Sequence, residues 1–248
     1  MEYFFDTPKP RLFAHRGLSH HANLDENTIE AFLAAVEHGA THLESDTQAT
    51  KDGHAVLFHD DDLFRVAGIN RRISELTLSD VKAIPLRFGG QIPTFEEALE
   101  QLPEARFNID VKTEAAISPT ISAIESQGAH ERVLLSSFAN PIRKRALAQL
   151  SRPTATSASQ STVIAAYLSH RLLFGLGFAS IVKDVHALQI PDRKGPVNFA
   201  SRSFIRRLQA HSTEVHYWTI NDPDHAQHLI NLGADGIVSD RVDLMNLR

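Results

Sequence analysis

The chain has 248 residues, 42% of them hydrophobic, which is enough to bury the core of one barrel-sized α/β domain. Its formal net charge of −5 argues against a nucleic-acid-binding surface, so any anion must be recognised locally by a few basic side chains. The absence of cysteine excludes disulfides, thiolate metal ligands and a cysteine nucleophile.

The amino terminus carries no targeting pattern. Residues 1–8 lack a basic start followed by a long apolar run, and no stretch of about 18 or more apolar residues occurs elsewhere. We therefore expect a cytoplasmic protein with no stable membrane association.

In chain order, short apolar segments typical of strands alternate with segments of helical periodicity, which predicts a parallel sheet, closed or doubly wound. The nine strand candidates outnumber the eight positions of a barrel, so one strand is extra or merged. The connection between residues 46 and 54 is too short for a crossover helix and indicates an irregular part of the barrel. The strand candidates lie near 11–15, 41–46, 54–58, 106–110, 132–136, 153–157, 185–190, 214–219 and 236–239.

Several helices have clear sequence boundaries. Residues 28–38 place Ile29, Phe32, Leu33 and Val36 on one apolar face. Thr94 and Glu97 form a capping box before a helix at 95–102, and Asp222 caps a helix that Pro223 opens and Gly233 ends.

Residues 60 to about 93 follow the third strand candidate and are rich in charge and turns. We expect a small insertion at the strand-end face that covers the site; the alternative is an ordinary long loop.

Three carboxylates are expected to share one site. Glu44 and Asp46 lie on one face of their strand, and Asp110 lies on the charged face of the segment near 106–110. The apolar faces would pack against helices, so the carboxylates point toward a barrel interior or cleft, where unpaired charge is costly. A hard divalent cation would relieve their repulsion. The alternative is that each is an ion-pair partner at the surface.

Two histidines stand where short apolar strands end: His15 after residues 12–14 and His59 after residues 55–58. In α/β barrels this edge carries the chemistry. Two imidazoles beside a metal and the cations of Arg16 and Lys112 suit phosphodiester hydrolysis, one removing a proton from the attacking hydroxyl and the other protonating the leaving oxygen. Because the chain has 14 histidines, the alternative for either is a structural role.

A series of short motifs runs in order from about residue 11 to about residue 240. It comprises His15-Arg16-Gly17, Glu26-Asn27-Thr28, Glu44-Ser45-Asp46, Thr50-Lys51-Asp52-Gly53, His59-Asp60 with Arg65, Asp110-Val111-Lys112, Ser136-Ser137-Phe138, Trp218-Thr219-Ile220-Asn221 and Asp235-Gly236-Ile237-Val238-Ser239-Asp240. In this order the motifs resemble the glycerophosphodiester phosphodiesterase family, in its cytoplasmic bacterial form. The resemblance implies one irregular TIM (β/α)8-type barrel domain over residues 1–248, with an insertion at about 60–93 after the third strand.

The resemblance also implies a metal site that holds one divalent cation, Mg²⁺ or Ca²⁺. Carried over by position, the ligands are Glu44, Asp46 and Asp110. The family usually has Glu at the third position, so the shorter Asp110 bears on metal affinity and metal choice.

The remaining site residues carry over in the same way. His15 and His59 match the acid–base pair, and Arg16 and Lys112 match the phosphate-binding cations. Glu26 matches the acid that orients the His-Arg pair; its alternative is a charge at a helix start, since Asn27 and Glu30 form a capping-box-like sequence.

Trp218 matches a residue at the pocket mouth that would pack on the glycerol carbons or on a choline-like head group by a cation–π contact. Its alternative is a core tryptophan. Phe138 is a weaker case of the same kind.

The expected reaction is metal-dependent hydrolysis of a small-molecule glycerophosphodiester to sn-glycerol 3-phosphate and an alcohol. Two alternatives remain: a lysophospholipase D-like phosphodiesterase acting on lipids, and a non-catalytic phosphate-binding barrel. An exposed apolar lip or a membrane-binding segment would favour the first, and the sequence shows neither.

Overall fold

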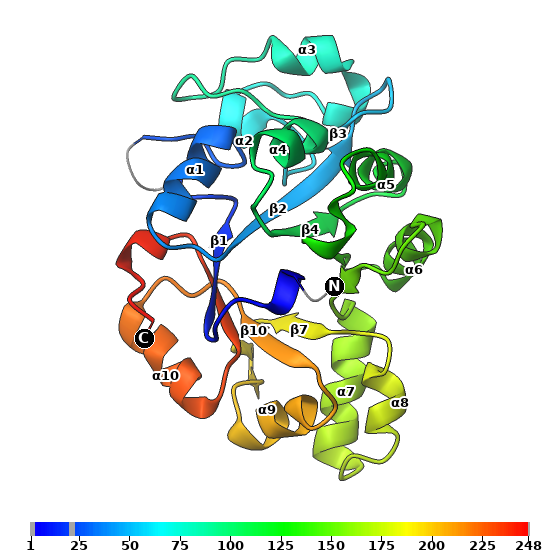
Figure 1. Cartoon of the computed structure of the whole chain (residues 1–248), viewed down its shortest axis with the longest axis vertical. Helices are drawn as coiled ribbons and strands as arrows, with labels where there is room; N and C mark the ends of the chain where they lie inside the picture. The colour runs from blue at the N-terminus through cyan, green and yellow to red at the C-terminus, as the bar shows by residue number, and fades with distance from the viewer. Residues whose placement is uncertain (1–2, 20–22, 248) are drawn as a thin grey trace.

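Eight parallel strands form the centre of the molecule in the computed structural model, which describes residues 3–19 and 23–247 (Figure 1). Their order is β6-β5-β4-β2-β1-β11-β10-β7, and a parallel bridge between Ser157 and Ala187 joins the two ends. The fold is therefore the predicted (β/α)8 barrel. The strands are β1 (Arg11–His15), β2 (His42–Ala49), β4 (Phe107–Val111), β5 (Val133–Ser136), β6 (Ala155–Thr156), β7 (Ala187–Ile190), β10 (Glu214–Tyr217) and β11 (Gly236–Ser239).

The extra strand of the sequence pattern is β3 (Ala55–Leu57). It turns back along β2 in antiparallel pairing, with Thr47 opposite Leu57 and Ala49 opposite Ala55. The short connection at residues 50–54 permits only a hairpin, which is why this strand adds to the barrel without taking one of its eight positions.

Helices surround the barrel in the order expected of alternating βα units (Figure 1). A second short hairpin, β8 (Arg193–Lys194) and β9 (Val197–Asn198), follows β7. The helices are α1 (Ile29–Glu37), α2 (Phe64–Ala67), α3 (Leu78–Lys82), α4 (Phe95–Gln101), α5 (Ile117–Ser126), α6 (Asn140–Gln149), α7 (Gln160–Leu172), α8 (Phe178–Val182), α9 (Arg202–Gln209) and α10 (Pro223–Leu232), with 3-10 turns η1 (Tyr3–Phe5), η2 (Ile73–Glu75), η3 (Ala129–Glu131) and η4 (Val242–Leu244).

The predicted helix caps at Thr94 and Asp222 are confirmed, and Gly233 ends α10 in a left-handed conformation. Helix α1 differs from the expectation. Its N-cap is Thr28, whose hydroxyl accepts from the Ala31 N–H. On the expected apolar face, Phe32 is buried as predicted, but Leu33 and Val36 are 47% and 46% exposed. The rest of the buried face is formed by the small residues Ala31 and Ala35.

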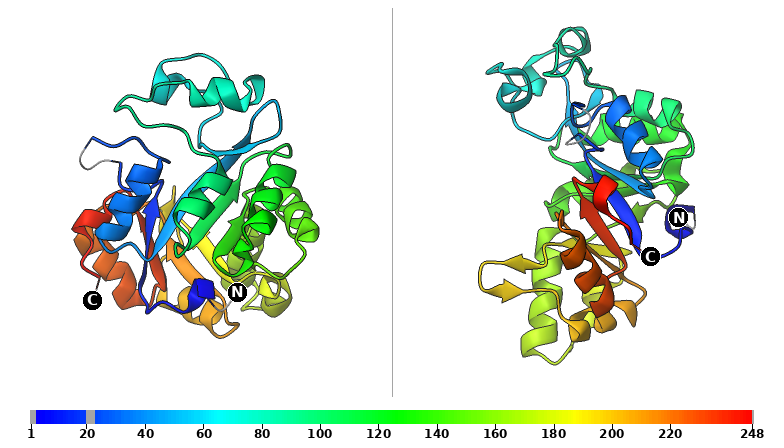
Figure 2. Two further views of the ribbon diagram at one scale, coloured as in Figure 1. Left: turned by 45° about the horizontal axis from the view of Figure 1, so that its top comes forward. Right: turned by 90° about the vertical axis from the view of Figure 1, so that its left-hand side faces the viewer.

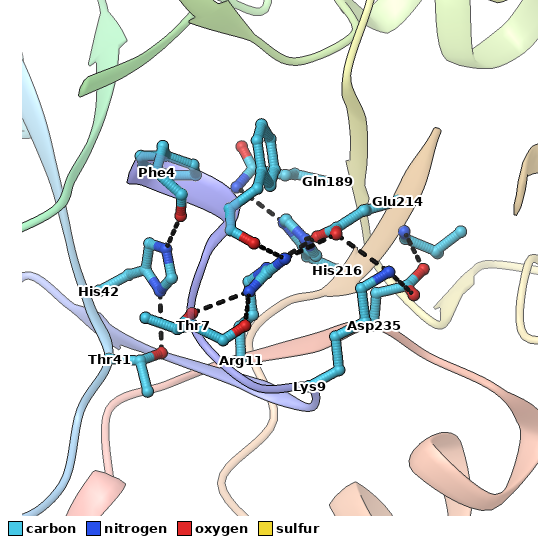
Figure 3. A network of polar contacts seen from close by, with 12 residues as sticks. Phe4, Thr7, Lys9, Arg11, Thr41, His42, Gln189, Glu214, His216 and Asp235 are labelled. Atoms are coloured by element: carbon cyan, nitrogen blue, oxygen red, sulfur yellow. Dashed lines mark hydrogen bonds and ion pairs between the residues drawn. The ribbon is translucent and has the colours of Figure 1, made fainter. Parts of the chain in front are cut away.

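The amino-terminal floor of the barrel is a polar network that is buried except at Lys9 (Figure 3). Arg11 donates to both carboxylate oxygens of Glu214 at 3.0 and 2.9 Å, and Lys9 pairs with Asp235 at 2.7 Å. The imidazole of His42 lies beside this network and is bonded to the Phe4 carbonyl at 2.8 Å. Because these partners come from the chain's start and its last two strands, the network ties the barrel's first and last elements together.

Residues 60–93 contain α2, η2 and α3 and stand at one end of the barrel (Figure 2). They have an apolar cluster of their own, which includes Leu63, Ile73 and Val81. Within the described residues, no helix is long and apolar enough to cross a bilayer.

Candidate active site

Strand register brings the predicted residues to one edge of the barrel. His15 pairs with Glu44 between β1 and β2, and Asp46 pairs with Asp110 between β2 and β4. His15 ends β1 and Asp110 lies near the end of β4, and the register places Glu44 and Asp46 of the longer β2 beside them. The four side chains therefore meet at the same mouth of the barrel. The side chains contribute to a cavity of about 730 Å³ that includes His15, Arg16, Glu44, Asp46, His59, Asp110, Lys112 and Trp218 among its lining residues.

The turn after His15 depends on two left-handed residues, Arg16 and Gly17, with φ of 57° and 80°. A Cβ atom at Gly17 would lie 2.8 Å from the backbone carbonyl carbon of Ala31, so only glycine allows α1 to approach this closely. The backbone N–H of Arg16 donates to the Glu44 carbonyl at 2.9 Å. The turn thus fixes the His-Arg pair against β2.

His15 is held by a carboxylate that the sequence reasoning did not select. Its Nδ1 lies 2.6 Å from Oδ1 of Asp240, and the Asn221 side-chain amide donates to Oδ2 of Asp240 at 2.8 Å. A carboxylate only accepts, so Nδ1 carries the proton and Nε2 is directed at the cavity, 3.9 Å from Glu44. Burial alone would lower the pKa of His15, but Glu44 and Asp240 outweigh it and raise that pKa.

His59 is held in the same way by its neighbour. Its Nδ1 lies 2.7 Å from Oδ1 of Asp60, and Arg65 donates to Oδ2 of Asp60 at 2.6 Å. Arg65 also grips Glu26 through two nitrogens, at 2.6 and 2.8 Å, and Glu26 accepts from Arg16 at 3.2 Å. A continuous chain of polar contacts therefore joins His59 to Arg16.

Glu26 links Arg65 to Arg16 in that chain of contacts and does not act as a helix-capping charge. Burial alone would raise its pKa, but hydrogen bonding to Arg65 and the charge of Arg16 outweigh burial, and the pKa of Glu26 falls below its usual range. Asn27, the other half of the suspected capping sequence, instead accepts a 2.7 Å hydrogen bond from Ser45.

Two of the three predicted metal ligands, Asp46 and Asp110, contact the Lys112 ammonium. Its Nζ is 2.6 Å from Asp46 and 2.8 Å from Asp110. Among the residues that the structure describes, no cationic side chain lies within hydrogen-bond distance of the Glu44 carboxylate. Burial, followed by the charge of Asp46, raises the pKa of Glu44 to about 7. Burial also raises the pKa of Asp110, although Lys112 opposes that shift.

These carboxylates fit a divalent cation in chemistry. Oδ2 of Asp46 is buried without a hydrogen-bond partner, and Nε of Arg16 lies 3.8 Å from it. Carboxylate oxygens are ligands that Mg²⁺ and Ca²⁺ prefer, and a cation would remove the cost of burying Glu44 beside Asp46. Within the part of the chain that the structure describes, no three such side chains already converge in a metal-binding arrangement.

The outer part of the cavity is apolar. Trp218 lines it and packs edge-on against Phe138, with ring centroids 6.1 Å apart. Further lining comes from Val163, Ile164 and Val197. Trp218 thus lies at the pocket as expected. The expected cover at residues 60–93 does not line this cavity; Arg65, Val66 and Phe88 of that insertion instead border a separate cavity with Glu26.

Sequence reasoning missed Asp240 and Asn221 as part of the site, although both stand in its closing motifs. The signal was topological: in a closed barrel the last strand pairs with the first, and β11 indeed pairs with β1. The end of β11 must therefore lie next to His15.

Comparisons with known proteins show the family to which the chain belongs. The model of the Glycerophosphoryl diester phosphodiesterase family matches residues 15–244. A probable glycerophosphodiester phosphodiesterase 2 of Mycobacterium tuberculosis is 37% identical, covering 94% of this chain and 88% of that protein. A glycerophosphodiester phosphodiesterase of Caldanaerobacter subterraneus subsp. tengcongensis is 30% identical, covering 96% and 98%.

A solved structure shares the fold. An Oleispira antarctica phosphodiesterase in complex with the product sn-glycerol-3-phosphate superimposes with a TM-score of 0.73 at 24% identity, covering 94% of each chain.

Proposed function

The chain belongs to the glycerophosphoryl diester phosphodiesterase family and is an enzyme of the phosphodiester hydrolase class, and we propose that it hydrolyses glycerophosphodiesters to sn-glycerol 3-phosphate and an alcohol with His15 and His59 as its acid–base pair. The observation that carries this proposal is that both imidazoles line one cavity while each Nδ1 is engaged by a carboxylate. Each Nε2 is then the nitrogen that exchanges protons.

One imidazole removes a proton from the attacking hydroxyl, and the other gives a proton to the oxygen that leaves as the alcohol. Asp240 and Asp60 hold the two rings in the required tautomer and stabilise each imidazolium as it forms. With water as the net reactant, one P–O bond forms and one breaks, so that phosphate stays on the glycerol and the alcohol departs.

Arg16 and Lys112 are the cations that face the phosphodiester. A guanidinium can donate to two phosphate oxygens at once, whereas an ammonium acts as a compact charge. Glu26 fixes Arg16 from behind, at 3.2 Å, which limits the side chain to orientations toward the cavity. Both cations offset charge that develops on the phosphoryl oxygens in the transition state.

Glu44, Asp46 and Asp110 are the residues that would hold one divalent cation, Mg²⁺ or Ca²⁺. When bound, such a cation supplies Lewis-acid polarisation of a phosphoryl oxygen. The unpartnered Asp46 oxygen and the raised pKa of Glu44 support this assignment. We further propose that residues 1–248 form one domain, because β1 and β11 are neighbours in one sheet.

The test is turnover of glycerophosphocholine and glycerophosphoethanolamine by the purified protein, with sn-glycerol 3-phosphate as the detected product, in EDTA and with added Mg²⁺ or Ca²⁺. His15→Ala and His59→Ala should each lose nearly all turnover while the folded fraction stays unchanged. The matched control is His54→Ala, because His54 is exposed and outside the cavity. Wild-type rates in either cavity variant would contradict the proposal.

The apolar outer cavity bears on the choice of alcohol. Phe138, Trp218 and Ile164 would suit an alcohol with an apolar portion better than a fully hydrated head group. A lysophospholipid is therefore the second substrate to assay. Activity on it alone, with none on the two small diesters, would favour the lipid-cleaving alternative.

A further inference from the structure

Helix α7 carries a row of exposed apolar side chains that begins at the rim of the catalytic cavity. Ile164, Leu168 and Leu172 follow one another at i, i+4 and i+8, so they share one helix face. They are 50%, 45% and 66% exposed. Ile164 also lines the cavity, so this row is continuous with the site.

The loop after α7 extends the row. Leu173, Phe174 and Leu176 are all exposed, and Phe174 reaches 90%. A backbone hydrogen bond connects this loop to the end of α7: the Gly175 N–H donates to the Ser169 carbonyl at 2.8 Å. We call Ile164, Leu168, Leu172, Leu173, Phe174 and Leu176 the α7 ridge. Exposed apolar groups gathered on one surface usually mark a place of interaction.

The segment of the chain that carries the α7 ridge is basic, unlike the rest of the chain. Residues 160–210 hold seven Lys and Arg against two Asp and Glu, whereas the whole chain holds 25 against 30. This segment is therefore positive within a protein of net charge −5. Arg193 and Lys194, at the exposed β8–β9 hairpin, also line the cavity mouth.

The hairpin and the helix form one surface. The Tyr167 hydroxyl of α7 donates to the Asn198 carbonyl of β9 at 3.3 Å, and the Tyr167 ring packs on Phe199. The right-hand view of Figure 2 shows the hairpin projecting beside α7. The basic hairpin and the apolar ridge are thus held side by side at the cavity mouth.

We propose that the α7 ridge and the β8–β9 hairpin dock this enzyme transiently on an anionic lipid bilayer. Apolar side chains of the ridge enter the boundary between head groups and acyl chains, while Arg193 and Lys194 contact anionic head groups. Such docking is reversible and needs no membrane-spanning helix, so it agrees with the expected absence of stable association. It goes beyond the proposed function and does not depend on it.

A bilayer fits this surface better than a second copy of the chain. In a two-fold symmetric dimer the same patch meets itself, so Arg193 and Lys194 of the hairpin beside the ridge would face like charges. An anionic bilayer instead offers the opposite charge over a continuous plane.

The test is co-sedimentation of the full chain with vesicles of phosphatidylcholine alone or mixed with phosphatidylglycerol. The wild type should bind the mixed vesicles more tightly, and added salt should weaken this binding. The double variant Leu172→Asp/Phe174→Asp should lower the affinity about tenfold or more. Arg193→Glu/Lys194→Glu should remove the preference for the anionic vesicles. Leu33→Asp, on α1 and 47% exposed, is the matched control and should bind as the wild type does.

Unchanged affinity in the Leu172/Phe174 variant, or no binding by the wild type, would overturn the proposal. So would a dimer in sedimentation velocity that this variant abolishes while vesicles remain unbound. Turnover of soluble glycerophosphocholine should stay the same in this variant, because neither residue lines the cavity. If the wild type lacked that turnover, the proposed function would fail, and vesicle binding would still test the docking.

Discussion

The Nδ1 of His15 and the Oδ1 of Asp240 lie 2.6 Å apart, although 225 positions separate these residues in the chain. The contact exists because the barrel closes between β1 and β11. Asn221 fixes Asp240 from the other side, donating to Oδ2 at 2.8 Å. The ends of the first and last strands therefore meet at one site, in which Asp240 holds the His15 ring.

We expect Asp240→Asn to lower kcat by about 100-fold, because the amide either donates to Nδ1 and selects the wrong tautomer or leaves the imidazolium unstabilised. KM should change little, since Asp240 faces the ring rather than the substrate. Steady-state kinetics over a range of pH would measure both. Asp224→Asn, exposed in the first turn of α10, is the control. An unchanged kcat would show that Asp240 has no positioning role.

The chain of polar contacts from His59 to Arg16 predicts losses of turnover that become smaller for residues farther from His59. Asp60→Asn should cause a large loss of turnover, because Asp60 contacts His59 directly. Arg65→Ala should reduce turnover by about tenfold, since Arg65 acts only through Asp60 and Glu26. Glu26→Gln and Arg65→Ala share one network, so their combined effect should be smaller than the product of the single effects. A double-mutant cycle on kcat/KM measures this coupling.

Arg71→Ala is the matched control for Arg65→Ala, because Arg71 is an exposed arginine of the same insertion and pairs only locally with Glu75. Equal losses in the two arginine variants would mean that the insertion is merely destabilised. Strict additivity of Glu26→Gln and Arg65→Ala would contradict the network.

We expect the buried Glu44 carboxylate to lower the stability of the cation-free protein and to favour cation binding. Its folded pKa is raised to about 7 without a cation, so its ionised form is unfavourable, and the stability loss grows as pH rises from the unfolded value toward 7. In EDTA at pH 8, Glu44→Gln should therefore be more stable than the wild type by about 1–3 kcal/mol. Millimolar Mg²⁺ or Ca²⁺ should stabilise the wild type and reverse this order.

Urea unfolding with and without the cation measures both effects. Glu30→Gln, on α1 and away from the carboxylates, is the control and should keep the cation response. A cation response in Glu44→Gln equal to that of the wild type would remove Glu44 from the ligand set.

Local sequence patterns predicted much of the fold. All nine strand candidates correspond to observed strands, because alternating burial and short apolar runs are local signals. Which strand was extra could not be decided locally, since β3 resembles a barrel strand in composition and only its pairing with β2 distinguishes it. The hairpin at 193–198 escaped notice because its strands have two residues each.

The site was predicted to the extent that its residues lie in motifs at strand ends. The contacts between motifs were not, because they depend on register. Lys112 lies between Asp46 and Asp110 since β2 and β4 align these two aspartates as partners. The exposed apolar face of α7 was missed for a related reason: α7 is apolar on more than one side, and sequence alone does not say which side packs.

The buried imidazole of His42, at the opposite end of the barrel from the site, predicts an acid-dependent loss of stability (Figure 3). Its Nε2 donates to the Phe4 carbonyl at 2.8 Å, and Nδ1 lies 2.8 Å from the Thr41 hydroxyl, so the neutral ring is fully bonded. Burial lowers the pKa of His42 to about 3, despite the opposing Phe4 hydrogen bond.

Because the unfolded chain binds a proton near pH 6.5 and folded His42 does not, the unfolded state is favoured as pH falls from about 6.5 toward 3. In that window His42 should make the free energy of unfolding fall by about 1.4 kcal/mol for each pH unit of acidification. Above about pH 7.5 it should contribute no pH dependence. Urea unfolding at several pH values between 5 and 8 would measure it. His42→Gln retains a side-chain amide that can donate to Phe4 and should be less stable than the wild type at pH 8. Its free energy of unfolding should vary less steeply with pH, because the one proton that His42 binds on unfolding is no longer taken up. His54→Gln, exposed in the β2–β3 turn, should keep the wild-type slope. If His42→Gln kept the full slope, the acid sensitivity would belong to other groups of the barrel floor.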